Sequence, residues 1–87
     1  MSDIIKDIQK NSKEIIRVEV SEFKGMKLIN LRIWFQVIDD NGNIDYKPSQ
    51  KGVALNITHY NDLKDAIERL GTYISDNGIQ VDPPRAE

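Results

Sequence analysis

The sequence contains no cysteine, a single histidine and no long apolar run. The lack of cysteine excludes a disulfide framework and a thiolate metal site. A membrane-spanning helix needs about 20 apolar residues, and no stretch approaches that length. The first residues, MSDIIKDIQK, have neither the apolar core nor the cleavage site of a secretory signal. We therefore expect a soluble intracellular protein that does not interact with a membrane.

Catalytic motifs are missing as well. The chain has no glycine-rich phosphate loop, no HExxH and no carboxylate pair placed with a base. The acidic pair Asp39-Asp40 belongs to an Asn-Gly turn, where carboxylates are ordinary turn formers, and no histidine or third carboxylate adjoins it. His59 has no recognisable nucleophile partner. We expect no enzyme activity, no metal or other cofactor and no small-molecule substrate.

Size and charge limit the possible functions. With 87 residues the chain forms one domain, and a domain of this size buries only about 60–65% of its unfolded surface, so we expect it to associate.

The formal net charge of −2 argues against nucleic-acid binding. However, residues 13–51 hold seven Lys/Arg against six Asp/Glu, whereas residues 59–87 hold three against six. A locally positive surface within residues 23–32, which contain no acid after Phe23, is compatible with a polyanion.

The stretch Phe23–Phe35 organises the rest of the chain. Strand side chains alternate between two faces, and the odd positions here form one continuous apolar face: Ile29, Leu31, Ile33, Phe35 and Val37. The even positions are mostly polar, yet they include the only tryptophan, Trp34, two residues from Arg32. A large aromatic beside a cation on an exposed strand face fits a stacking site for nucleic-acid bases. Packing of Trp34 under a loop or in a subunit interface is the alternative.

Residues 15–23 alternate in the same way, with Ile16, Val18 and Val20 on one face. Phe23 then falls on the polar face, together with Trp34. Two strands thus place an aromatic on the polar face, which strengthens the stacking hypothesis; closure of the sheet end by Phe23 is the alternative. A bulge near Trp34 would change which of Trp34 and Phe35 points outward, so both remain candidates.

The remaining segments predict an α+β fold. Residues 1–14 are predicted to be a flexible arm, too short for a stable helix. Strands are predicted over 15–23, 27–38, 44–47 and 51–57, and Pro48 ends the third. A helix with an apolar seam follows, at spacings of three and four: Tyr60, Leu63, Ile67, Leu70 and Ile74. We predict a four-stranded curved antiparallel β-meander followed by one amphipathic α-helix (β-β-β-β-α), dimeric, as a domain over residues 15–74 with a mobile tail over 75–87.

Four segments in order resemble a known family. They are Val18–Arg32 (VEVSEFKGMKLINLR), Lys47-Pro48, Lys51–Asn56 (KGVALN) and Tyr60–Lys64 (YNDLK). The chain looks like the single-stranded-DNA-binding domain of the transcriptional coactivator positive cofactor four and its bacterial relatives, over about residues 15–70. The serine-rich arm of the eukaryotic members is missing. We therefore expect a bacterial or phage-type protein of the cytoplasm or nucleoid; a eukaryotic member would be nuclear.

The resemblance implies a homodimer that binds single-stranded DNA with little sequence specificity, by base stacking and phosphate contacts. The process implied is transcription regulation or DNA repair and recombination, and such contacts do not separate DNA from RNA. Stacking would come from Phe23 and from Trp34 or Phe35. The resemblance and the charge pattern together give these predicted DNA-binding residues: Phe23, Lys24, Lys27, Arg32, Trp34, Phe35, Lys47, Lys51 and Gly52. The predicted dimer interface is Leu63, Ile67, Leu70 and Ile74.

Two positions depart from the family pattern. Met26 stands where a lysine often follows F-K-G, and Ser49-Gln50 stands where Gly-Arg is frequent. The loss of one or two phosphate contacts would weaken binding or flatten its salt dependence. The alternative function is a protein-protein interaction module of the same fold without nucleic-acid binding, which the acidic balance permits.

Overall fold

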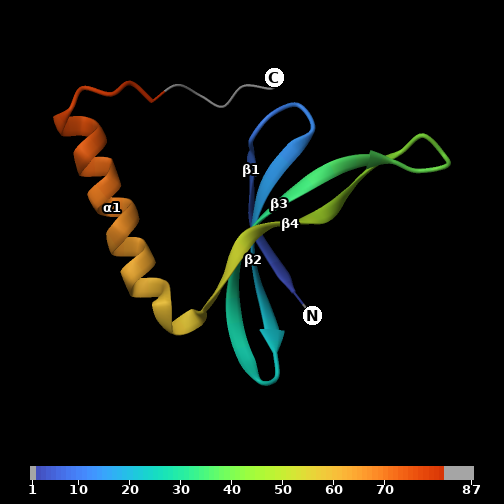
Figure 1. Cartoon of the computed structure of the whole chain (residues 1–87), viewed down its shortest axis with the longest axis horizontal. Helices are drawn as coiled ribbons and strands as arrows, with labels where there is room; N and C mark the ends of the chain where they lie inside the picture. Colours follow the sequence, from blue (N-terminus) through green and yellow to red (C-terminus); the bar gives the residue numbers. More distant parts are fainter. Residues whose placement is uncertain (1, 82–87) are drawn as a thin grey trace.

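Four antiparallel strands in one sheet and one helix make up the computed structural model, which describes residues 2–81. The strands follow chain order, β1 (Asp3–Gln9), β2 (Glu14–Phe23), β3 (Met26–Ile38) and β4 (Ile44–Asn56). A short 3₁₀ turn, η1 (Ile57–His59), leads to α1 (Tyr60–Asp76). The hairpins fan out from the twisted centre of the sheet, and α1 leads away from it (Figure 1). The predicted β-β-β-β-α meander is confirmed, although its strands are bounded differently.

The predicted flexible arm over residues 1–14 was wrong for the part that forms β1. This strand pairs antiparallel with β2, beginning with Asp3 opposite Val20. A bulge between Ile4 and Lys6 interrupts the pairing. An inserted residue shifts the alternation of side chains, so the sequence of β1 shows no clean strand period. Pairing along β2 supplies the backbone hydrogen bonds that so short a segment lacks on its own.

β4 continues through Pro48, where the sequence pattern predicts the end of a strand. Arg32 and Trp34, two positions apart on β3, pair with Gly52 and Pro48, four positions apart on β4, so β4 bulges here. Within the bulge, the Ser49 hydroxyl donates a 2.8 Å hydrogen bond to a carbonyl of β3. Proline is tolerated on an edge strand and at a bulge, and β4 offers both. The strands predicted over 44–47 and 51–57 are therefore one strand, β4. The sheet still has four strands because it includes β1, which was not predicted as a strand.

Positive φ angles shape two places in the sheet. Lys24 (φ 51°) and Gly25 (φ 80°) form the two-residue turn between β2 and β3, as the primed hairpin turns require. Gly52 has φ 155°, and a Cβ added there would lie 2.5 Å from the Leu31 carbonyl oxygen. The sequence left open whether Gly52 admits a ligand or starts a strand. Its close neighbour is the backbone of β3.

One face of the sheet, here the apolar face, meets the start of α1. The β2–β3 register places Val18 opposite Leu31 and Val20 opposite Ile29, which is 6% exposed. These four side chains line an apolar pocket of about 320 Å³ together with residues of β1, η1 and α1: Ile5, Ile57, Tyr60 and Leu63. The first turn of α1 thus borders this pocket together with the sheet.

Beyond that first turn, α1 keeps its apolar seam largely exposed. Ile67 is 59% and Leu70 51% exposed, and the helix contains no buried residue. The helix ends at Asp76, so the predicted tail over 75–87 begins inside it, and residues 82–87 of that tail lie outside the described residues. Among residues 2–81, no helix is long and apolar enough to cross a membrane.

Candidate nucleic-acid interface

The opposite side of the sheet, here the polar face, carries three of the predicted site residues. Arg17 stands opposite Arg32, and Ile15 stands opposite Trp34. Residues opposite each other project to the same side, and positions two apart on a strand share a face. Phe23, six positions beyond Arg17 on β2, therefore shares the face of Arg32 and Trp34, as the alternation predicted.

Trp34 and Phe35 lie on opposite faces of the sheet. The bulge sits in β4, so the alternation along β3 is uninterrupted. Phe35 stands opposite Glu14 and Lys47, on the apolar face, and is 39% exposed. The structure thus does not gather both aromatic candidates of β3 on one surface, and Lys47 accompanies Phe35 rather than Trp34.

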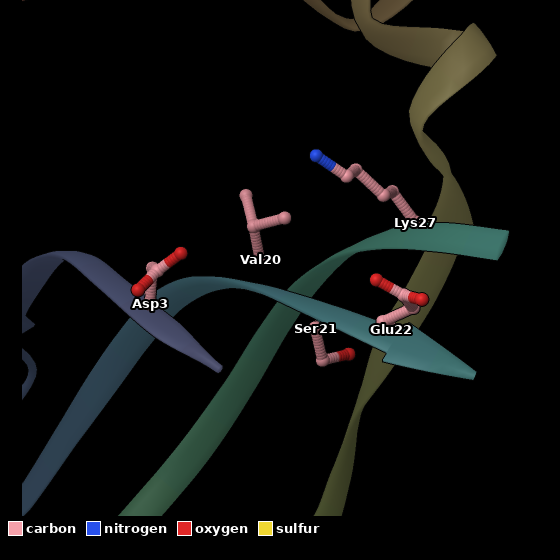
Figure 2. Close-up of a pocket in the computed structure, with 5 residues that line it drawn as sticks. All are labelled: Asp3, Val20, Ser21, Glu22 and Lys27. Carbon is pink, nitrogen blue, oxygen red and sulfur yellow. The ribbon is translucent and has the colours of Figure 1, made fainter. Parts of the chain in front are cut away.

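Lys27 also lies on the apolar face, in an acidic setting. It stands opposite Glu22, and the two line a polar pocket of about 160 Å³ with Asp3, Val20 and Ser21. Figure 2 shows Lys27 and Val20 projecting to one side of the strands and Ser21 to the other. Two carboxylates beside Lys27 reduce the positive potential there. Among the predicted cations, this one is poorly placed for a phosphate.

Phe23 and Lys24 form an exposed tip at the turn between β2 and β3. Phe23 is 55% exposed, and the Lys24 ammonium lies 5.3 Å from its ring centroid. Met26 beside them is 46% exposed and is approached by the Asn56 amide, whose nitrogen lies 3.8 Å from the Met26 sulfur. An open aromatic ring next to a cation is able to stack a base and contact its phosphate.

Trp34 is half-buried, and Arg17 covers its ring. The Arg17 guanidinium lies 4.5 Å from the ring centroid, and the indole Nε1 is buried without a hydrogen-bond partner. Asp7 accepts two hydrogen bonds from Arg17, from Nε at 2.8 Å and from Nη2 at 3.1 Å. These bonds raise the pKa of Arg17 above its ordinary value, against the opposing effect of burial. Trp34 is therefore a partly covered aromatic rather than an open platform.

Arg17 was absent from the predicted site, although the alternation already put it on the polar face. The missing signal was the strand register, which brings Arg17 opposite Arg32 and diagonal to Trp34. The alternating pattern of one strand does not determine which residue of the next strand stands opposite. A pairing of the two arginines could have been found only by fixing the Lys24-Gly25 turn as a two-residue turn and counting back along both strands.

Two further predicted cations lie at the bulge of β4: Arg32 of β3, on the polar face, and Lys51 within the bulge itself. Arg32 donates from Nη1 to the Ser49 carbonyl at 2.9 Å, and Lys51 follows with an exposed side chain beside Gly52. The ion pairs within residues 2–81 involve other cations, namely Lys10, Arg17 and Arg69. Over the same residues, no group of three or more His, Asp or Glu side chains is placed to hold a metal ion. Lys24, Arg32 and Lys51 thus keep their charge available to an anion.

Comparison with known families settles what kind of chain this is. The family described as transcriptional coactivator p15 (PC4) matches residues 10–66. The chain belongs to the PC4 family. The match contains every predicted DNA-binding position, whereas β1 precedes it and three predicted interface residues follow it: Ile67, Leu70 and Ile74.

Solved structures of PC4 homologues share the fold. The orthorhombic crystal form of a homologue from Burkholderia pseudomallei K96243 has a TM-score of 0.68 at 18% identity, over 80% of this chain and 89% of that one. The tetragonal form gives 0.67 at 18%, over 82% and 98%. The bacteriophage T5 homologue of the eukaryotic coactivator PC4, implicated in recombination-dependent DNA replication, gives 0.59 at 20%, over 90% and 82%. No curated protein matches the chain. These relatives, from a bacterium and a phage, are consistent with the expected bacterial-type PC4 member.

Proposed function

We propose that this PC4-family protein binds single-stranded nucleic acid, DNA in the first place, with little sequence preference. The observation that supports it most directly is the exposed tip, where Phe23 and Lys24 combine an open ring with a cation. Family membership supports the same function. The proposed process is transcription regulation or DNA repair and recombination.

The binding mechanism needs no covalent chemistry. A base stacks on the Phe23 ring. Lys24 beside it, Arg32 on the polar face and Lys51 in the bulge of β4 neutralise phosphates. Stacking and phosphate contacts engage features that every nucleotide shares, so sequence preference is weak. They also leave the 2′-hydroxyl unread, so the same surface accepts RNA.

We further propose that the binding unit is a homodimer. The chain exposes two apolar surfaces, the seam of α1 and the pocket on the apolar face, and one copy covers neither of them. A second copy offers a surface of matching character to each, as an isologous two-fold contact requires. Two sheets that present their polar faces to one strand bind more tightly than either sheet alone.

A titration of the full chain with fluorescently labelled oligothymidine, at low and at moderate salt, tests the proposed function. Binding that weakens as salt rises is the expected result. No binding at low salt would favour the alternative, a protein-protein interaction module. The observations behind that alternative are the net charge of −2 and the neutralisation of Arg17 by Asp7.

A further inference from the structure

Asp7 and Arg17 form an ion pair between neighbouring strands on the polar face. They stand opposite each other in the β1–β2 ladder, and two carboxylate oxygens meet two guanidinium nitrogens at 2.8 and 3.1 Å. The Arg17 side chain is 15% exposed and the Asp7 side chain 38%. The same fork of parallel hydrogen bonds is the one in which arginine binds a phosphate group.

Arg17 also faces a second arginine. It stands opposite Arg32 in the β2–β3 ladder, and like charges opposite each other on a sheet repel. Asp7 is ion-paired with Arg17, and Glu19 on the same face also attracts the Arg17 charge. Arg32 bonds a neutral acceptor, the Ser49 carbonyl, at 2.9 Å. An anion that reaches both guanidiniums would relieve the repulsion more fully than Asp7 does from one side.

We propose that Arg17 and Arg32 together form a binding site for a nucleic-acid phosphate. Asp7 of β1 competes with that phosphate for the Arg17 guanidinium and so weakens binding. The inference rests on the proposed function and adds a further binding residue, Arg17, to it. The carboxylate oxygens of Asp7 occupy the positions on the guanidinium fork that two phosphate oxygens would take. The guanidinium carbon of Arg17 also lies over the Trp34 ring, 4.5 Å from the ring centroid, and this contact remains to orient Arg17 when Asp7 releases it.

Asp7 lies outside the part of the chain that matches the PC4 family. The PC4 match begins at residue 10, after β1, whereas Arg17, Arg32 and Trp34 all lie inside it. β1 is also an edge strand with every residue exposed, so it can shift without unpacking a core. A competitor on such a strand is displaced at little cost when a polyanion arrives.

The variant Asp7→Asn tests the competition. Asparagine keeps the shape of the side chain and removes its charge. We expect oligothymidine to bind about two- to fivefold more tightly at low salt, as loss of one competing ion pair allows. The slope of log K against log salt should stay close to the wild-type value, because Arg17 contacts phosphate in both complexes once Asp7 has been displaced.

Two controls separate competition from a general change of charge. Asp3→Asn removes the same charge from the same strand, but Asp3 stands opposite Val20 on the apolar face and lines the pocket shown in Figure 2. It should change affinity much less than Asp7→Asn. In an Arg17→Gln background, Asp7→Asn should have no effect, because the group that Asp7 blocks is gone.

A measurement on the unmodified protein guards against variants that loosen β1. Arg69 forms a similar pair with Asp65 on α1, with the same 2.8 Å Nε–Oδ distance. Saturation with oligothymidine should move the NMR signal of the Arg17 Nε–H and leave that of Arg69 in place. An Arg17 signal that stays fixed during saturation would overturn the proposal.

The outcomes distinguish this inference from the proposed function. One outcome is that the wild type binds while Asp7→Asn changes the affinity no more than Asp3→Asn does, or changes it equally in the Arg17→Gln background. In either case the proposed function stands and the competition is refuted. If neither the wild type nor Asp7→Asn binds at low salt, both are refuted. If Asp7→Asn alone binds, the competition is established and the wild-type strand β1 is inhibitory.

Discussion

The ammonium of Lys24 lies 5.3 Å from the ring centroid of Phe23, at the tip of the β2–β3 hairpin. Lys24 reaches this position because it adopts a positive φ of 51° in a two-residue turn. The side chain therefore projects over Phe23, the last residue of β2, instead of continuing the alternation of the strand. The turn thus places the cation next to an exposed ring on the polar face.

Phe23→Ala should weaken binding of oligothymidine by about 1–3 kcal/mol, the usual effect of losing one base stack. Phe35→Ala is the matched control, because Phe35 is also exposed but lies on the apolar face. Fluorescence titrations of both variants decide which face holds the nucleic acid. A loss of affinity with Phe35→Ala and none with Phe23→Ala would show that the stacking platform lies on the apolar face instead.

Lys24→Ala, Arg32→Ala and Lys51→Ala should each reduce the magnitude of the log K against log salt slope by about 0.7. Each is expected to weaken binding equally for any base sequence, since phosphate contacts carry no sequence information. Lys64→Ala, on the exposed side of α1, serves as the control and should leave the slope unchanged. Slopes that stay at the wild-type value in the three sheet variants would mean that the strand runs elsewhere.

The polar face was predictable from sequence because strand alternation is local. The positions of Phe23, Arg32 and Trp34 follow from counting residues along β2 and β3, and the structure keeps that alternation. Arg17 was missed as a site residue because its importance depends on which residues stand opposite it, and strand register is a non-local property. Lys27 and Lys47 were included from the charge pattern and the family resemblance, neither of which gives the strand face, and the register puts them on the other face.

The strand boundaries were harder to predict for a related reason. β1 and β4 each contain a bulge, and both are edge strands. A bulge breaks the two-residue period that identifies a strand in sequence. Pro48 looked like a strand end because a central strand excludes proline, whereas an edge strand at a bulge accepts it. Only pairing with a neighbour shows that these segments are strands.

Gly52→Ala should destabilise the sheet by about 2 kcal/mol or more, because a backbone at φ 155° strains any other residue and the added methyl would meet the Leu31 carbonyl at 2.5 Å. Thermal unfolding followed by circular dichroism measures the effect. Gly42→Ala is the control for a positive φ without a clash, since nothing lies within 4 Å of its added Cβ. Equal melting temperatures for the two variants would contradict the close approach of β3 and β4.

Acid should loosen the turn between β1 and β2 through Glu14. Hydrogen bonds from Asn11 (2.8 Å) and Lys10 (3.2 Å) lower the pKa of the Glu14 carboxyl below its ordinary value. A lowered pKa in the folded state means that this contribution to stability is present above the ordinary value, about 4.3, and is lost as pH falls through the folded one. An NMR titration of the carboxyl gives the pKa directly. A value at or above the ordinary one would contradict the prediction.

Leu70→Glu should dissociate the proposed dimer. Leu70 is 51% exposed on the seam of α1, and Leu63, at the start of that seam, lines the apolar pocket of the sheet. Each leucine or isoleucine removed from water contributes about 1.5–3 kcal/mol, and a two-fold contact uses each residue twice, so a few seam residues suffice for a stable dimer. A glutamate there would bring two like charges into the interface.

Thr72→Glu, which adds the same charge to α1 off the seam, is the control. Analytical ultracentrifugation should find two chains for the wild type and Thr72→Glu and one for Leu70→Glu, with weaker oligothymidine binding by the latter. A wild-type mass of one chain at micromolar concentration would refute the dimer and the shared binding surface that depends on it.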